Sequence, residues 1–167
     1  PPSETGREAL AEQAKYALVE TLFASPASLA IGAIAGSIIA TCAAFAVQDR
    51  LMELVAMLIS LIGAARVWSA IAFRKQQKRG DAARRSNWDL IYELGAWSYA
   101  FLLGLFSFFA LIRAEDLLPQ LMAVTLSTGY AGGITGRNAG RPAMAIGQLS
   151  LAALPVSAAL FFFHDGA

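Results

Sequence analysis

Two charged residues interrupt a long apolar stretch. Because a charge in such a stretch costs free energy, both are candidate functional residues. Glu53 and Arg66 both fall within residues 51–70, a segment long enough to cross a bilayer. Uncompensated charges in hydrocarbon are expensive, so those that persist often serve proton relays or ligand contacts. Thirteen positions separate the two, which places them on different helix faces and roughly 20 Å apart, so they cannot pair. A solvated Glu53 and an Arg66 that extends to the lipid head groups are the plainer interpretations, and we favour both.

Residues that usually carry catalysis or hold a cofactor are scarce in this sequence. It has one histidine, His164, and one cysteine, Cys42. One such chain cannot form a haem site with two histidines or a multi-cysteine metal site. Cys42 lies in an apolar run, where a thiol is a small packing group. The apolar segments also lack paired carboxylates and a nucleophile beside a base. We therefore expect no catalytic, cofactor or metal site, and an intramembrane enzyme is the least favoured class.

Glycines recur at helical spacing in two places. Residues 129–140 contain three overlapping pairs of glycines four positions apart, and residues 32–36 contain a fourth pair. This spacing lets two helix backbones approach closely, so we predict helix packing there, within the bundle or in a homodimer. A ligand contact is the alternative, but a phosphate-binding loop is excluded because no Gly-Lys-Ser/Thr sequence follows. The predicted packing residues are Gly32, Gly36, Gly129, Gly132, Gly133, Gly136 and Gly140.

Two arginines flank the end of the second glycine series. Arg137 and Arg141 lie four positions apart, with Asn138 between them. Their charges could bind an anionic head group or pair with acids of a cytoplasmic domain. Alternatively they serve only to fix the topology of the chain in the membrane.

The elements that must position these residues are membrane-spanning helices. Of the 167 residues, 57% are hydrophobic and only 15% are charged, which excludes a disordered tail and a nucleic-acid binder. The apolar residues gather into runs long enough to cross about 30 Å of hydrocarbon. We predict an all-α fold, a polytopic transmembrane helical bundle of five spans at residues 28–47, 51–70, 94–112, 117–135 and 143–163.

Features outside the spans complete the predicted organisation. Residues 5–24 have a capping box and an apolar face, so residues 1–26 are expected to hold an amphipathic cytoplasmic or interfacial helix. Residues 27–164 form the transmembrane domain, and residues 165–167 an outer tail. The fourth span is the least apolar and is expected to be surrounded by other helices. Asp116 is expected to cap that span, and Pro155 to kink the fifth.

The distribution of basic residues predicts the orientation. With the N-terminus in the cytoplasm, ten Lys and Arg residues lie on the inner side and two on the outer side, with Arg66 inside a span. The positive-inside rule therefore places the N-terminus in the cytoplasm of a multi-pass protein. The long basic loop is too short and too poor in aromatic residues for a nucleic-acid surface.

Three stretches carry a resemblance to a known group of proteins. They are Tyr92-Glu93-Leu94-Gly95-Ala96-Trp97, then Tyr130-Ala131-Gly132-Gly133-Ile134-Thr135-Gly136-Arg137-Asn138-Ala139-Gly140-Arg141-Pro142, and Ile146-Gly147-Gln148-Leu149. Over about residues 5–165 the sequence resembles the N-terminal membrane region of bacterial cyclic-di-GMP signalling proteins. In those proteins several spans precede a cytoplasmic GGDEF diguanylate cyclase domain, often with an EAL phosphodiesterase domain.

This resemblance implies a sensory or anchoring module in the bacterial inner membrane, with the bilayer, a second copy and a cytoplasmic output domain as partners. The chain contains neither output domain, so synthesis or cleavage of the nucleotide would belong to the parent protein. An even number of spans would keep that domain in the cytoplasm, so with five we expect a truncation before a sixth. The alternative is a small transporter or membrane-complex subunit, in which Gln120, Gln148 and Glu53 are the residues to mutate.

Overall fold

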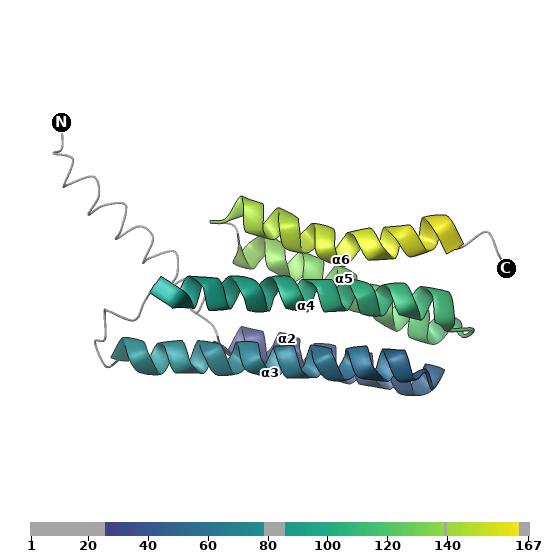
Figure 1. Cartoon of the computed structure of the whole chain (residues 1–167), viewed down its shortest axis with the longest axis horizontal. Coiled ribbons are helices and arrows are strands. Elements are labelled where there is room, and N and C mark those ends of the chain that lie inside the picture. Colours follow the sequence, from purple (N-terminus) through teal and green to yellow (C-terminus); the bar gives the residue numbers. More distant parts are fainter. Residues whose placement is uncertain (1–25, 79–85, 139, 164–167) are drawn as a thin grey trace.

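The structure is a computed structural model, and it describes residues 26–78, 86–138 and 140–163. The predicted N-terminal helix and the outer tail lie outside the described residues. Within them the chain is all helical and forms five helices along a common direction (Figure 1). These helices are α2 (Pro26–Val47), α3 (Arg50–Lys78), α4 (Ser86–Arg113), α5 (Leu117–Arg137) and α6 (Pro142–Phe163).

Helix α4 is the centre of the bundle. It contacts all four other helices and lies between α3 and α6 in Figure 1. Its sequence explains this position, because buried residues recur every three or four positions along it and give an apolar face that runs its whole length. These residues are Tyr92, Ala96, Tyr99, Ala100, Leu103, Phe106, Ser107 and Ala110.

Four of the five described helices are long and apolar enough to cross a membrane, namely α2, α3, α4 and α6. This confirms a helical protein compatible with a lipid bilayer, with one such helix fewer than the five predicted. Helix α5 does not qualify because glycines and hydroxyl residues dilute its apolar content. The hydrophilic stretch at residues 72–89 is also more helical than expected, since α3 continues to Lys78 and α4 begins at Ser86.

The two ends of the bundle differ in chemistry. The starts of α2, α4 and α6 and the ends of α3 and α5 form what we call the Asn138 end. At the opposite end, the Asp49 end, the Asp49 carboxylate accepts hydrogen bonds from the backbone amides of Leu51 and Met52 and pairs with Arg113. This caps α3 and ties it to α4. Asp116 was expected to cap α5, but its side chain makes no capping bond.

Close helix approach uses glycines that the sequence reasoning did not single out. A Cβ atom at Gly104 of α4 would meet the backbone oxygen of Leu151 and would lie 3.0 Å from Cγ of Pro155, both in α6. A Cβ at Gly147 would meet the ring of Trp97. Helices α4 and α6 therefore pack closely because these two positions lack a side chain.

Buried polar contacts hold α5 against α4. The hydroxyl groups of Ser107 and Ser127 lie 2.6 Å apart, and Ser107 also bonds to the backbone oxygen of Ala123 at 2.8 Å. Around them, a core of small and large apolar residues fills the middle and the Asp49 end, including Ala40, Met52 and Phe106. The bundle is therefore solidly packed from its middle to the Asp49 end.

Candidate functional site

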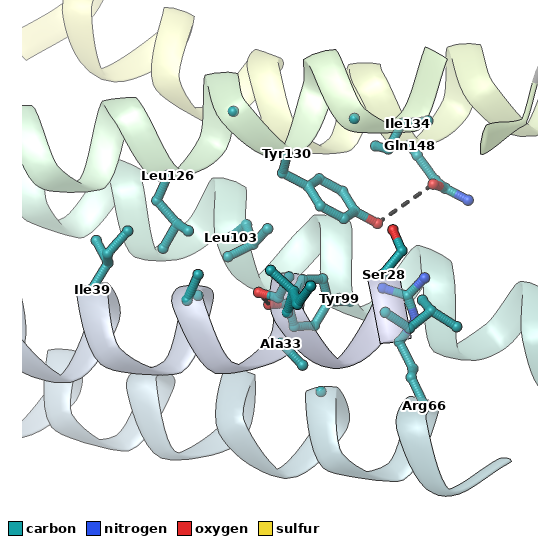
Figure 2. A pocket seen from close by; sticks show the side chains of 18 of the residues that line it. Ser28, Ala33, Ile39, Arg66, Tyr99, Leu103, Leu126, Tyr130, Ile134 and Gln148 are labelled. Carbon is teal, nitrogen blue, oxygen red and sulfur yellow. Dashed lines mark hydrogen bonds between the residues drawn. The ribbon is translucent and has the colours of Figure 1, made fainter. Parts of the chain in front are cut away.

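A cavity among the described residues, which we call the Arg66 cavity, lies towards the Asn138 end, between α2, α3, α4 and α5, with Gln148 of α6 in its wall. Its volume is about 400 Å³, within the range of small-ligand sites. Figure 2 shows Arg66 rising from α3 on one side, and Tyr130 and Gln148 entering from the other. Apolar side chains such as Leu29, Leu126 and Ile134 make up much of the rest of the lining. The site thus combines an apolar wall with a few convergent polar groups.

Arg66 is the single charged residue among the described residues that line this cavity. Its Cζ atom lies 5.1 Å from the ring centroid of Tyr99, a cation–π contact. Within the described part of the chain, its guanidinium has neither a carboxylate nor a hydrogen-bond acceptor. The Arg66 side chain packs against Gly95 and faces the cavity, and its extension to the lipid head groups stays a prediction.

Tyr99 forms the floor of the cavity. It is 4% exposed, and its hydroxyl group donates to the backbone oxygen of Gly32 at 3.5 Å. Its ring packs edge to face against that of Tyr130, with the centroids 5.3 Å apart. Gly36 lies directly against the Tyr99 hydroxyl, so a side chain there would displace it. Five of the predicted packing glycines have described surroundings. Of these five, only Gly36 lies in close contact with a side chain of another helix among the described residues.

Gln148 carries an unpaired donor in the wall of the cavity. It is 1% exposed, and its Oε1 atom accepts bonds from Asn138 at 3.3 Å and Tyr130 at 3.4 Å. Its Nε2 atom has no partner among the described residues. Asn138 accepts a further bond from Tyr92 at 3.4 Å, so one chain of hydrogen bonds joins α4, α5 and α6. A buried donor left unpaired costs about 1–3 kcal/mol, which makes Nε2 a ready contact for a ligand.

The cavity opens along a groove between α2 and α5. The rim consists of exposed residues from both helices, including Ile31 and Gly32 of α2 and Thr125, Gly129 and Gly133 of α5. Helix α5 was expected to be surrounded by other helices, and this is corrected, because only one of its sides is buried. The exposed side carries its glycines.

These glycines do not bring two helices of this chain together. Among the described residues, and apart from the neighbouring residues and backbone of the same helix, no heavy atom lies within 4 Å of where a Cβ would stand at Gly32, Gly129, Gly132 or Gly133. Close packing of these positions inside the chain is therefore corrected, while their contact with a second copy stays a prediction. Gly140 is exposed in the turn before α6, and the prediction for Gly136 lies outside the described side chains.

Arg141 has partners within its own chain. Its guanidinium bonds to Asp89 and, at 3.1 Å, to Glu93, both on the first turns of α4. These two acids compete with the predicted pairing of Arg141 with a head group or another domain, and that pairing stays a prediction. Asn138, the other described residue of that prediction, is 2% exposed and bonds inward. The side chain of Arg137 lies outside the described residues.

The remaining candidates lie away from the cavity. Glu53 is exposed on the first turn of α3, near the Asp49 end, and does not meet Arg66. Gln120 donates to the backbone oxygen of Ala114 at 2.7 Å, also near the Asp49 end. Cys42 is exposed on α2, whereas we expected it to be packed. Pro155 lies inside α6, opposite Gly104.

The arrangement offers groups that can bind a ligand. Among the described residues there is no cluster of three or more His, Cys, Asp or Glu side chains that could hold a metal. The cavity instead offers a cation, a free amide donor and tyrosine hydroxyls beside an apolar groove. No protein-family model, curated protein or solved structure matches this chain.

Proposed function

We propose that this chain is a membrane-embedded sensory module that binds a ligand in the Arg66 cavity and regulates a cytoplasmic output domain. The resemblance described above favours a bacterial diguanylate cyclase or cyclic-di-GMP phosphodiesterase as that domain. The observation that carries the proposal is the position of Gln148. It lines the cavity and also belongs to the hydrogen-bonded chain that joins α4, α5 and α6.

A ligand bound to Gln148 would change the packing of three helices at once. The Nε2 atom is free to bind, while Oε1 already holds Asn138 and Tyr130. Helix shifts of about 1–2 Å are a common means of transmitting such a change to another domain. The solid core at the Asp49 end, with residues such as Met52 and Phe106, would act as the fixed part against which the Asn138 end moves.

We further propose that α5 is a fifth span and that the N-terminus is cytoplasmic, in the bacterial inner membrane. Helix α5 has 21 residues, which gives about 31 Å, the thickness of the hydrocarbon layer. Arg74, Lys75 and Arg141 lie at the Asn138 end, whereas Arg50 and Arg113 lie at the other. The positive-inside rule then favours a cytoplasmic Asn138 end. A homodimer would use the exposed glycine side of α5.

The test is the nucleotide turnover of the full-length protein in liposomes. The coding sequence that follows residue 167 should encode a sixth span and then a GGDEF or EAL domain. The variant Gly133→Leu, which fills the groove, should change turnover severalfold. Gly132→Leu places the same side chain on the same helix outside the cavity. A change in Gly133→Leu alone would assign the effect to the cavity, whereas equal changes in both variants would assign it to the contact with a second copy. Turnover that is indifferent to Gly133→Leu, and also to removal of residues 1–167, would reduce this module to a plain anchor.

A small transporter or membrane-complex subunit is the second candidate. The observation in its favour is that polar and glycine residues of α5, namely Thr125, Gly129 and Gly133, line a cavity. Alternating access would require a second opening towards the Asp49 end. The packed core around Met52 and Phe106 fills that half of the bundle. Substrate-dependent flux in liposomes would favour the transporter over the sensor.

A further inference from the structure

We propose that the Arg66 cavity binds an anionic lipid, whose phosphate or carboxylate contacts Arg66 and Gln148 and whose acyl chain lies in the groove between α2 and α5. The inference rests on the proposed function in so far as this lipid would be the signal of the sensory module. Its binding can be measured without any output domain, so the two proposals fail separately.

The positive charge of the cavity favours an anionic ligand. Arg66 has no carboxylate partner within the described part of the chain, and no Asp or Glu is found among the described residues that line the cavity. The guanidinium of Arg66 lies over the ring of Tyr99. Its N–H groups donate no hydrogen bond to another described residue. Arginine binds phosphate and carboxylate groups through two parallel hydrogen bonds, so these groups fit it best.

A second, independent feature of the cavity wall is a buried hydrogen-bond donor that lacks an acceptor among the described residues. The side chain of Gln148 is 1% exposed, and its Nε2 donor is unpaired within the described residues. Both residues line the same cavity. A neutral ligand with acceptor oxygens could bond to the Gln148 amide but would leave the Arg66 charge unbalanced, whereas an anion with several acceptor oxygens would satisfy both.

The shape of the cavity calls for an apolar tail on that anion. Beside the polar groups, the lining is formed by residues such as Leu29, Ile39 and Leu126. The groove opens on the side where Ile31 is 69% exposed and Ile34 is 60% exposed, a surface suited to hydrocarbon. A free phosphate would leave the apolar part of the 400 Å³ empty. An acyl chain would fill it, at about 0.8 kcal/mol for each buried methylene group.

The polar groups also lie at the depth of a lipid head group. Ser28 is near the start of α2, and Asn138 directly follows the end of α5, so the cavity reaches the Asn138 end of the bundle. Arg66 lies about two turns before Arg74 and Lys75, where α3 becomes hydrophilic. A lipid could therefore enter sideways from one leaflet and keep its head group near the interface.

The test is lipid binding to the purified chain in a neutral detergent, measured by native mass spectrometry. The probes are phosphatidylglycerol, oleate, phosphatidylcholine and inorganic phosphate. We expect the two anionic lipids to bind more tightly than phosphatidylcholine. Arg66→Gln should weaken them by about tenfold, which equals about 1.4 kcal/mol. The matched control Lys75→Gln removes one charge from the same helix outside the cavity and should change affinity by less than about twofold.

A second pair of variants tests the groove without touching the charge. Gly133→Leu should weaken both anionic lipids by about tenfold because it occupies the space for the chain, while Gly132→Leu should not. Leucine is a better helix former than glycine, so both variants should fold. Three results would overturn the proposal. Lys75→Gln could lose as much lipid affinity as Arg66→Gln, or Gly133→Leu could bind the anionic lipids as tightly as the wild type. Inorganic phosphate could also displace a bound lipid as effectively as a second anionic lipid does. The tighter of the two anionic lipids identifies the head group.

Discussion

The guanidinium of Arg66 on α3 lies over the ring of Tyr99 on α4, with its Cζ atom 5.1 Å from the ring centroid. Tyr99 in turn reaches the backbone of Gly32 on α2 through its hydroxyl group. One aromatic side chain thus joins three helices and holds the cation at the cavity. The cavity depends on this ring more than on any bond that its hydroxyl group makes.

Removing the Tyr99 ring should therefore lower the free energy of unfolding far more than removing its hydroxyl group. Tyr99→Ala should lower the free energy of unfolding by about 3 kcal/mol, because it leaves a void beside Leu103 and Tyr130. Tyr99→Phe keeps the ring and loses one long hydrogen bond, so it should cost less than about 1 kcal/mol. Denaturant titration in detergent measures both. Similar losses in the two variants would mean that the hydroxyl group, rather than the ring, supports the site.

The glycine at the contact of α4 with α6 should not tolerate a methyl group. Gly104→Ala would push against the backbone oxygen of Leu151, which cannot move aside as a side chain can. We expect a loss of about 1–3 kcal/mol in unfolding free energy. Gly132→Ala is the matched control, since its methyl group meets nothing within 4 Å, and it should be neutral or stabilising by up to about 1 kcal/mol. A neutral Gly104→Ala would show that the two helices are not in close contact.

Asp49 should make the stability of the bundle depend on pH in the acid range. Hydrogen bonds from the amide of Met52, then the contact with Arg113 and the amide of Leu51, hold the pKa of its carboxyl group below the usual value. Folding therefore favours the charged form. Its contribution is complete above the unfolded pKa, near 4, and is lost as the pH falls through the lower pKa of the folded state.

The measurement is the melting temperature of the wild type and of Asp49→Asn as a function of pH. Asparagine can still cap α3 but cannot pair with Arg113. The wild type should be the more stable of the two at neutral pH, and the difference should shrink below about pH 4. A difference that stays constant down to low pH would contradict a role for the charge.

The contact of Arg141 with α4 should give a measurable coupling. Arg141 is 16% exposed as a side chain, but Asp89 and Glu93 are 25% and 43% exposed, so water weakens the pair. A double-mutant cycle of Arg141→Gln with Asp89→Asn should give a coupling of about 0.5–1 kcal/mol. Lys75→Gln combined with Asp89→Asn is the control and should give none. Zero coupling in the first cycle would mean that Arg141 does not pair with Asp89 and is available for the predicted head-group contact.

Much of the fold follows from the sequence, because hydrocarbon imposes simple rules. The apolar runs predict the helix boundaries within about two residues, as the start of α5 at Leu117 shows, except for the end of α3 and the start of α4. The helical continuation to Lys78 was missed because polar residues at a helix end resemble a loop. In the structure Trp88 donates to Gln76 and packs on Phe73, contacts between two helix ends that periodicity alone does not reveal.

The site was harder to predict than the fold. Arg66 and Gln148 were both singled out, but their meeting in one cavity depends on the order of helices around the bundle, which periodicity does not fix. The glycine spacing of α5 is compatible with a close helix contact and with an open groove. From the spacing alone we predicted the close contact. Tyr99 and Tyr130 gave no signal, since aromatic residues at helical spacing are ordinary core residues.

The most direct test is nuclear magnetic resonance of the Arg66 side chain. The chain, labelled with ¹⁵N-arginine, is placed in phosphatidylcholine nanodiscs, and the guanidinium signal of Arg66 is assigned by its loss in Arg66→Gln. Added phosphatidylglycerol should shift this signal in the wild type and in Gly132→Leu but not in Gly133→Leu. A signal of Arg66 that stays in place at saturating phosphatidylglycerol would contradict an anionic lipid in this cavity.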